Sequence, residues 1–131
     1  MGRKPRFQPT ASELELAARI LLGAIGEVGW FTKAEQGDAN KPGLAGLRLP
    51  KLSSLAKRKA SLRNVFCEQL RLGYVPSAFE EIGDAEMGKR STVEWEWRFR
   101  FHGIDLFVKT ELDVSDVDYP ILYIKDIGLK Q

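Results

Sequence analysis

The most constraining feature of this sequence is a nine-residue stretch in which large apolar and charged side chains alternate strictly. The apolar positions are Val93, Trp95, Trp97, Phe99 and Phe101, and the charged positions between them are Glu94, Glu96, Arg98 and Arg100. This period of two is typical of a β-strand that buries one face and exposes the other. The stretch therefore predicts a half-buried strand.

A second alternating stretch follows after His102 and Gly103 and runs from Ile104 to Leu112. A two-residue turn gives the inward pairs Phe101–Ile104, Phe99–Leu106, Trp97–Val108, Trp95–Thr110 and Val93–Leu112. Nearly all of these pairs are apolar, and a shift of one residue would destroy that match. The outward face pairs Arg100 with Asp105 and Glu96 with Lys109, which supports the same register. Gly103 can adopt the positive φ that such a turn needs. The pattern predicts an antiparallel hairpin.

The remaining elements follow from caps and periodicity. A capping box at Thr10–Glu13 predicts a helix that ends near Gly26, and a second long helix is expected from Ser53 or Ser54 to Leu72. Another capping box predicts a short helix over residues 77–82, and residues 121–127 form a third strand. We expect an α+β fold in which two long helices pack on one face of a C-terminal three-stranded antiparallel β-meander.

Length and composition limit the class of protein. The 131 residues suggest one domain over residues 10–131, preceded by an extended basic arm over residues 1–9. Cys67 is the only cysteine and His102 the only histidine, which excludes an internal disulfide and a histidine-based metal centre. The longest apolar run, residues 20–26, is too short to span a membrane. We expect a soluble cytoplasmic protein that needs neither a metal nor another cofactor.

Positive charge is concentrated in the middle of the chain. The net charge is only +2, but residues 41–75 hold eight cations against Glu68 alone, a net charge of +7. Within the second helix, the candidate nucleic-acid-binding residues are Lys57, Arg58, Lys59 and Arg63. Arg58 falls on the apolar side, from which its long side chain is expected to reach water. Two interpretations stay open: a surface that attracts polyanions, or a solvated helix whose cations balance acidic neighbours.

The exposed face of the predicted sheet combines cations with aromatic rings. Its candidate binding residues are Phe107, Tyr123 and Lys125, beside Arg98, Arg100 and Lys109. Single-stranded nucleic acid suits such a surface, because phosphates meet charge while bases stack on rings. The alternative is ordinary cross-strand pairing, with Phe107 covered by another element.

Some of these residues also suit catalysis. Metal-independent RNA cleavage needs a base near the 2′-hydroxyl, cations for the charge that develops on phosphorus, and an acid for the leaving group. The candidate catalytic residues are Arg98, Arg100, His102 and Lys109. The alternative is that His102 is only the first residue of a tight turn. Asp113, Asp116 and Asp118 lack the spacing of an EF-hand, and a turn in which aspartates bond their own backbone is favoured over a cation site.

Helices followed by an antiparallel meander with basic sheet residues, over roughly residues 53–127, resemble the small bacterial ribonuclease toxins of the RelE-like type. The resemblance lies in layout and residue type, and it implies an endoribonuclease that acts on RNA without a metal. RNA or DNA is therefore the expected partner. The alternative is a non-enzymatic interaction or inhibitor protein that engages a protein partner through its charged surfaces.

Overall fold

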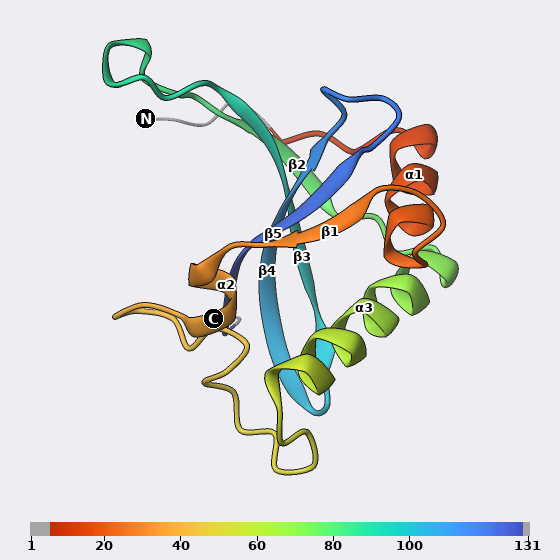
Figure 1. The fold of residues 1–131 in the computed structure, drawn as a ribbon, viewed down its shortest axis with the longest axis vertical. Coiled ribbons are helices and arrows are strands. Elements are labelled where there is room, and N and C mark those ends of the chain that lie inside the picture. The colour runs from red at the N-terminus through yellow and green to blue at the C-terminus, as the bar shows by residue number, and fades with distance from the viewer. Residues whose placement is uncertain (1–5, 130–131) are drawn as a thin grey trace.

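Five strands form one mixed sheet in the order β1-β5-β4-β3-β2 (Figure 1). The structure is a computed structural model that describes residues 6–129. The strands are β1 (Glu27–Trp30), β2 (Ser77–Glu81), β3 (Thr92–Phe101), β4 (Ile104–Asp113) and β5 (Ile121–Leu129). β1 runs parallel to β5, and every other neighbouring pair is antiparallel.

The predicted hairpin is confirmed as β3 and β4. Four of the five expected pairs are present, from Phe101–Ile104 to Trp95–Thr110. His102 and Gly103 both have positive φ, at 49° and 80°, as a tight two-residue hairpin turn requires. Inside the hairpin, the Trp97 indole N–H donates to the Thr110 hydroxyl at 2.9 Å. The single polar position on the core face is thereby satisfied.

The predicted three-stranded meander is incomplete. β5 pairs with β4 as expected, but β2 and β1 extend the sheet at its two edges. Residues 77–81 were expected to start a helix and instead form β2. Ala78 and Phe79 are both fully buried there, on opposite faces of the sheet. Pairing with β3 therefore outweighs the roughly 1 kcal/mol that a helix cap contributes.

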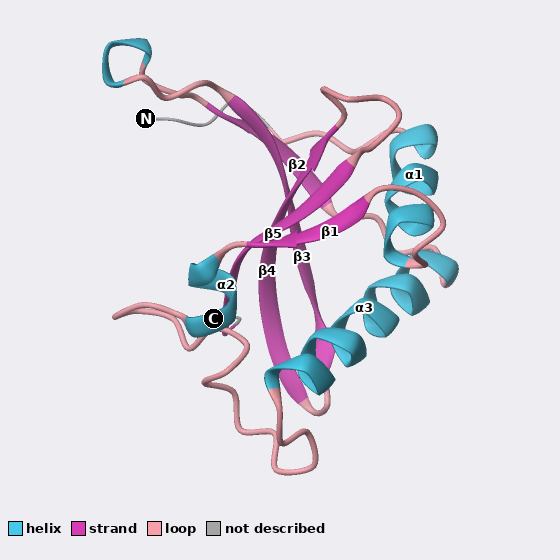
Figure 2. Cartoon of the chain, viewed as in Figure 1, coloured by secondary structure: helices cyan, strands magenta, loops and turns pink. Residues whose placement is uncertain are grey.

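The helices are α1 (Ala11–Leu21), α2 (Thr32–Gln36) and α3 (Leu55–Arg71), with a short 3-10 turn, η1 (Ala85–Met87). The capping box that starts α1 is present, since Thr10 and Glu13 bond each other's backbone N–H groups at 3.1 and 2.8 Å. α1 ends at Leu21, short of Gly26, so only α3 is long. Figures 1 and 2 show α1 and α3 on the same side of the sheet.

The core lies between these two helices and the apolar face of the sheet. Phe66 of α3 contacts Trp97 and Phe99 of β3 with ring centroids 4.6 and 5.3 Å apart. Burial of each such side chain stabilises the fold by roughly 2–3 kcal/mol. Leu44 and Leu49, from the irregular segment between α2 and α3, are also buried in this core. The segment is therefore anchored to the core by these side chains and does not lie wholly on the surface.

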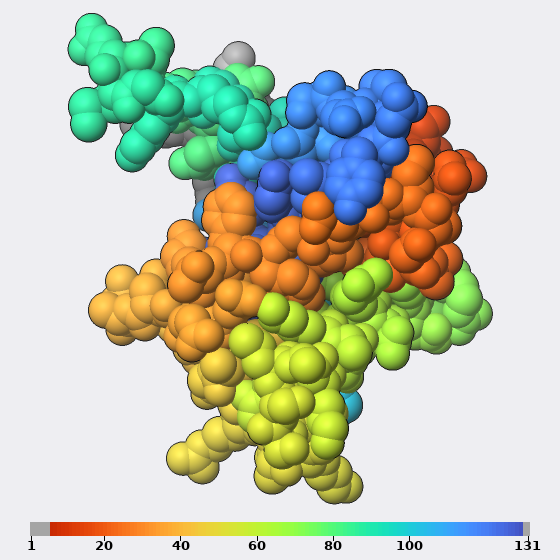
Figure 3. Space-filling model, viewed as in Figure 1, coloured from red at the N-terminus to blue at the C-terminus, as the bar shows by residue number. Residues whose placement is uncertain are grey.

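Part of the predicted basic arm joins the sheet. Phe7 pairs with Ala78 through two backbone hydrogen bonds, of 2.9 and 2.8 Å, at the outer edge of β2. Arg3 and Lys4 of that arm lie outside the described residues. The connection between β2 and β3 stands away from the body of the molecule (Figure 3). Among residues 6–129, no helix combines the length and apolar character needed to cross a bilayer.

Candidate functional site

The sheet face that α1 and α3 leave uncovered is unusually rich in charge, and we call it the charged face. It is formed by Phe79 on β2, Glu94, Glu96, Arg98 and Arg100 on β3, Asp105, Phe107, Lys109 and Glu111 on β4, and Tyr123, Lys125 and Asp126 on β5. A register shift between β4 and β5 lets Lys125 and Asp126, adjacent in sequence, both lie on this face.

Four carboxylates at the centre of the charged face are almost completely buried. The exposed fractions are 6% for Glu94, 2% for Glu96, 6% for Glu111 and 2% for Asp126. Taking an ionised carboxylate out of water is costly unless the charge is paired and hydrogen-bonded. Each of the four is accordingly bonded to a cation.

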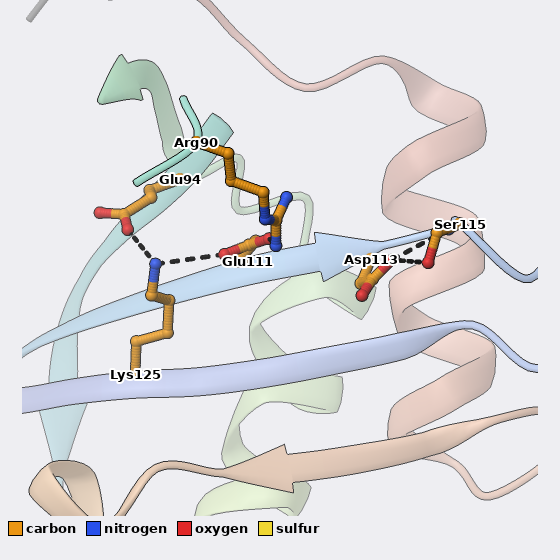
Figure 4. A network of polar contacts seen from close by, with 6 residues as sticks. All are labelled: Arg90, Glu94, Glu111, Asp113, Ser115 and Lys125. Atoms are coloured by element: carbon orange, nitrogen blue, oxygen red, sulfur yellow. Dashed lines mark hydrogen bonds and ion pairs between the residues drawn. The ribbon is translucent and has the colours of Figure 1, made fainter. Parts of the chain in front are cut away.

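One ammonium group joins two of these carboxylates. Lys125 Nζ donates to Glu94 and, at 3.1 Å, to Glu111, and Figure 4 shows it between the two side chains. Arg90 bonds the second oxygen of Glu111 at 3.0 Å. The network therefore links three strands through their side chains, in addition to the backbone ladder.

The environment of Lys125 keeps its charge in place. Burial by itself lowers the pKa of the ammonium, but the hydrogen bonds and negative charges of Glu94 and Glu111 outweigh burial and raise the pKa above its ordinary value. Lys125 is therefore protonated at neutral pH and acts as a fixed cation. It is unsuited to the role of a general base.

The other two buried carboxylates are paired from outside the β3–β5 meander. Glu96 bonds Arg6 of the N-terminal segment and lies 3.6 Å from the Arg98 guanidinium. Asp126 bonds Lys41 and lies 3.8 Å from the Lys33 ammonium. The centre of the charged face is thus tied to segments distant in sequence.

Cations also lie over aromatic rings on this face. The Arg98 guanidinium lies 4.8 Å from the centre of the Phe107 ring, and the Lys109 ammonium lies 5.6 Å from that of Phe79. Each such contact contributes roughly 0.5–2 kcal/mol. The Arg98 side chain remains 44% exposed and that of Arg100 70% exposed, so both stay accessible to a ligand.

Most of the predicted sheet residues share this face. The structure places Arg98, Arg100, Phe107, Lys109, Tyr123 and Lys125 on it, although their accessibility differs. Lys125 is engaged by two glutamates, whereas Arg100 contacts only Asp105, at 3.2 Å, among the residues described. The exposed positions lie nearest the β3–β4 turn.

His102 lies apart from the charged face, at the tip of the hairpin. Its Nε2 is 2.7 Å from the Ser61 hydroxyl of α3, on the helical side of the molecule. Arg98, Arg100 and Lys109 therefore share one face, whereas the ring of the fourth predicted catalytic residue, His102, lies against α3.

The predicted cations of α3 are engaged largely with the protein itself. The prediction that the Arg58 side chain reaches water is wrong. Its guanidinium instead donates to the carbonyls of Leu44, Ala45, Leu47, Leu49 and Leu52. Arg63 donates to the carbonyls of Ile20 and Leu21 at the end of α1, and Lys59 bonds Glu35. Lys57 remains exposed.

The sequence pattern did not indicate several residues of the site. Alternation places Glu94 and Glu111 on the charged face, but nothing local signals that they are buried. Phe79 was missed because its segment was expected to be helical. In the acidic loop, Asp113 accepts from Ser115 and Asp116 from the backbone of Asp118, as the turn interpretation predicts. The Ser115 hydroxyl and N–H lower the pKa of Asp113.

Within residues 6–129, no three potential metal-ligating side chains gather into a group that could hold an ion. The chain matches no family model, no curated protein sequence and no solved structure.

Proposed function

We propose that this chain binds single-stranded RNA through the exposed end of the charged face and cleaves it without a metal ion. The observation that carries the proposal is the pairing of Arg98 with Phe107, beside the exposed Arg100, on a sheet face that α1 and α3 leave bare. Guanidinium groups bind phosphates, and an accessible ring stacks with a base whatever its identity. We also propose a cytoplasmic location for this activity.

The buried carboxylates support this role by fixing the cations. Glu96 lies 3.6 Å from Arg98, and its side chain is only 1% exposed. It is therefore too deep to contact a ligand, but it restrains Arg98 before RNA arrives. A preorganised cation loses less conformational entropy on binding.

The cleavage step follows from the resemblance to RelE-like toxins. The 2′-oxygen attacks the adjacent phosphorus while its proton passes to a base, and the bond to the 5′-oxygen breaks as that oxygen accepts a proton. The products are a 2′,3′-cyclic phosphate and a 5′-hydroxyl. Arg98, Arg100 and Lys109 are the cations available for the charge on phosphorus. His102, two residues beyond Arg100, is the candidate for proton transfer.

The test uses purified protein and end-labelled single-stranded RNA in the presence of a chelator. Native gels measure binding and denaturing gels measure cleavage in the same reaction. We expect Arg98→Gln with Phe107→Leu to weaken binding at least tenfold, since one stacked base alone contributes about 1–3 kcal/mol. His102→Ala should abolish cleavage while weakening binding less than the Arg98–Phe107 double variant does.

The matched control is Arg19→Gln on α1 with Leu22→Ala at the C-cap of that helix, where both residues are exposed. It removes one cation and one exposed apolar side chain away from the charged face. Equal losses in the two double variants would reject the charged face as the binding surface. Binding without cleavage would retain an RNA-binding protein and reject the endoribonuclease.

A second candidate function is docking of a protein partner. A mainly apolar groove of about 620 Å³ lies between α1 and the end of α3, lined by Leu14, Ala18, Leu22, Cys67, Leu70 and Val75 among others. Leu22 at its margin is 72% exposed. Binding to a partner that resists high salt but is lost in Leu22→Asp would favour this function over RNA binding.

A further inference from the structure

The β3–β4 turn forms one wall of a separate pocket. This pocket, of about 380 Å³, is lined by Arg48, Leu49, Pro50, Lys51, Leu52 and His102. Figure 1 shows the turn, the start of α3 and the segment before it together at one end of the molecule. The pocket is distinct from the charged face, which contributes none of these residues.

Every charged or titratable side chain that lines this pocket is a base. Arg48 and Lys51 are exposed, and neither forms an ion pair with any residue that the structure describes. No carboxylate lies among the lining residues. This differs from the charged face, where buried glutamates pair with Arg98 and Lys125. An anion is therefore the ligand that the pocket would attract most strongly.

The walls of the pocket are held in place from behind. The Arg58 guanidinium donates to the carbonyls of Leu49 and Leu52, at 3.3 and 2.8 Å, and so fixes the segment that carries Arg48 and Lys51. On the opposite wall, the Ser61 hydroxyl lies 2.7 Å from the His102 ring and restrains its orientation. The site thus exists before a ligand binds, which lowers the entropy lost on binding.

We propose that this pocket binds a phosphate-bearing nucleotide unit. Arg48, Lys51 and His102 supply donors for the phosphate, while Pro50 and Leu52 supply an apolar surface for the sugar and base. A free phosphate ion would leave that apolar wall unused, so the combination favours a nucleotide.

The source of the nucleotide follows from the position of the pocket, and this step rests on the proposed function. Arg100 on the charged face is the penultimate residue of β3, and His102 in the pocket is the first residue of the β3–β4 turn. A strand of RNA bound over Arg98 and Arg100 can therefore continue around the turn. The pocket then holds the next phosphate along the strand.

The experiment follows backbone amide signals of the full chain by NMR during titration with a single-stranded RNA hexanucleotide. Adenosine 5′-monophosphate is titrated separately as the second probe. We expect RNA to shift signals at residues 48–52 and 102 as well as those of β3 and β4. Arg48→Ala with Lys51→Ala should abolish the pocket shifts, and the slope of log K against log salt should become shallower by about 0.7 because the contact with one phosphate is lost.

The matched control is Arg19→Ala with Lys89→Ala, which removes two exposed cations from outside both surfaces. RNA shifts confined to β3 and β4 would overturn the pocket and keep the proposed function. Shifts confined to the pocket, with either probe, would support the nucleotide site and reject the charged face. Saturable binding of the monophosphate alone would identify a free nucleotide as the ligand. If neither probe shifts any signal, both proposals are overturned.

Discussion

At the scale of single residues, the charged face depends on a few fixed cations. Lys125 neutralises Glu94 and Glu111, and the Lys125 side chain is itself only 17% exposed. Loss of one partner of a buried pair destabilises a protein far more than loss of an exposed pair, because a charge is left without compensation. This network is therefore the most sensitive polar feature of the sheet.

Lys125→Met should lower the free energy of unfolding by about 2–3 kcal/mol at pH 7, because it leaves two buried carboxylates without their shared cation. Chemical denaturation measures the change. Lys89→Met, at an exposed position, is the control and should stay within about 0.5 kcal/mol of wild type. A Lys125 variant as stable as its control would show that the network contributes nothing.

The difference in unfolding free energy between wild type and Lys125→Met should depend on pH in a definite direction. The folded state raises the pKa of Lys125 above its ordinary value of 10.5, so the folded chain holds this proton more tightly than the unfolded chain. The contribution to stability is complete below the unfolded value and is lost as the pH rises through the folded value. The difference between wild type and Lys125→Met should stay constant from about pH 7 to 9 and narrow above pH 10.5. A stability difference that already narrows near pH 8 would contradict the raised pKa of Lys125.

At the scale of elements, α3 is bound to its neighbours by arginines that donate to backbone carbonyls. Arg58 donates to five carbonyls of residues 44–52, the segment before α3. This segment has no regular structure of its own. A guanidinium group suits this task because its donors form a planar fork, which an ammonium group lacks.

Arg58→Lys keeps the charge and should still loosen the segment over residues 44–52. We expect a loss of about 2 kcal/mol in stability, since several buried carbonyls lose a charged donor. Hydrogen exchange and limited proteolysis within residues 44–52 should both accelerate. Lys57→Ala, next to it on the exposed side of α3, is the control, and equal protection in the two variants would contradict the role of Arg58.

The entry into β1 depends on Gly26. Gly26 has φ of +61°, and a Cβ atom built there would lie 1.8 Å from the Pro120 carbonyl oxygen, close to where Glu27 begins pairing with β5. Gly26→Ala should therefore destabilise the protein by more than about 2 kcal/mol, through backbone strain and overlap together. Gly23→Ala is the control: it has φ of +81°, but an added Cβ would meet only the Arg63 guanidinium, at an ordinary contact distance of 4.0 Å, so about 1 kcal/mol is expected. Thermal unfolding measures the stability of both variants. Equal losses of stability would contradict the predicted overlap between a Cβ at residue 26 and the Pro120 carbonyl.

The elements that could be predicted are those whose signal is local. The β3–β4 register follows from alternation, because one face of both strands is buried and a shifted register would expose it. β2 gives no such signal, since Ala78 and Phe79 are buried on opposite faces and the alternation disappears. The same argument explains the site. Alternation groups Arg98, Arg100 and Lys109, but the bond from Lys41 to Asp126 spans 85 residues and has no local signature.

At the scale of the whole molecule, β5 occupies an inner position in the sheet although it is the last described strand. It lies between β1 and β4, and it carries Lys125 and Asp126 of the charged face. Without β5, β1 has no strand to pair with, and Glu94 loses its cation.

A chain that stops after Asp118 should therefore fail to fold. We expect neither a cooperative denaturation transition nor near-ultraviolet circular dichroism from Trp95 and Trp97. The control shortens the exposed β2–β3 connection within residues 83–89 and should keep a cooperative transition. Cooperative unfolding of the truncated chain would show that β1–β4 form a stable unit alone.

The inner position of β5 also sets the order of events during synthesis. A ribosome makes β1 before β5, so β1 must wait for most of the chain to emerge before its partner exists. During that interval the Glu94 and Glu111 carboxylates stay solvated, because Lys125 has not yet been added. If the charged face acts on RNA, the nascent chain is inactive until β5 has paired with β4. Activity then begins only when β5 has left the ribosome.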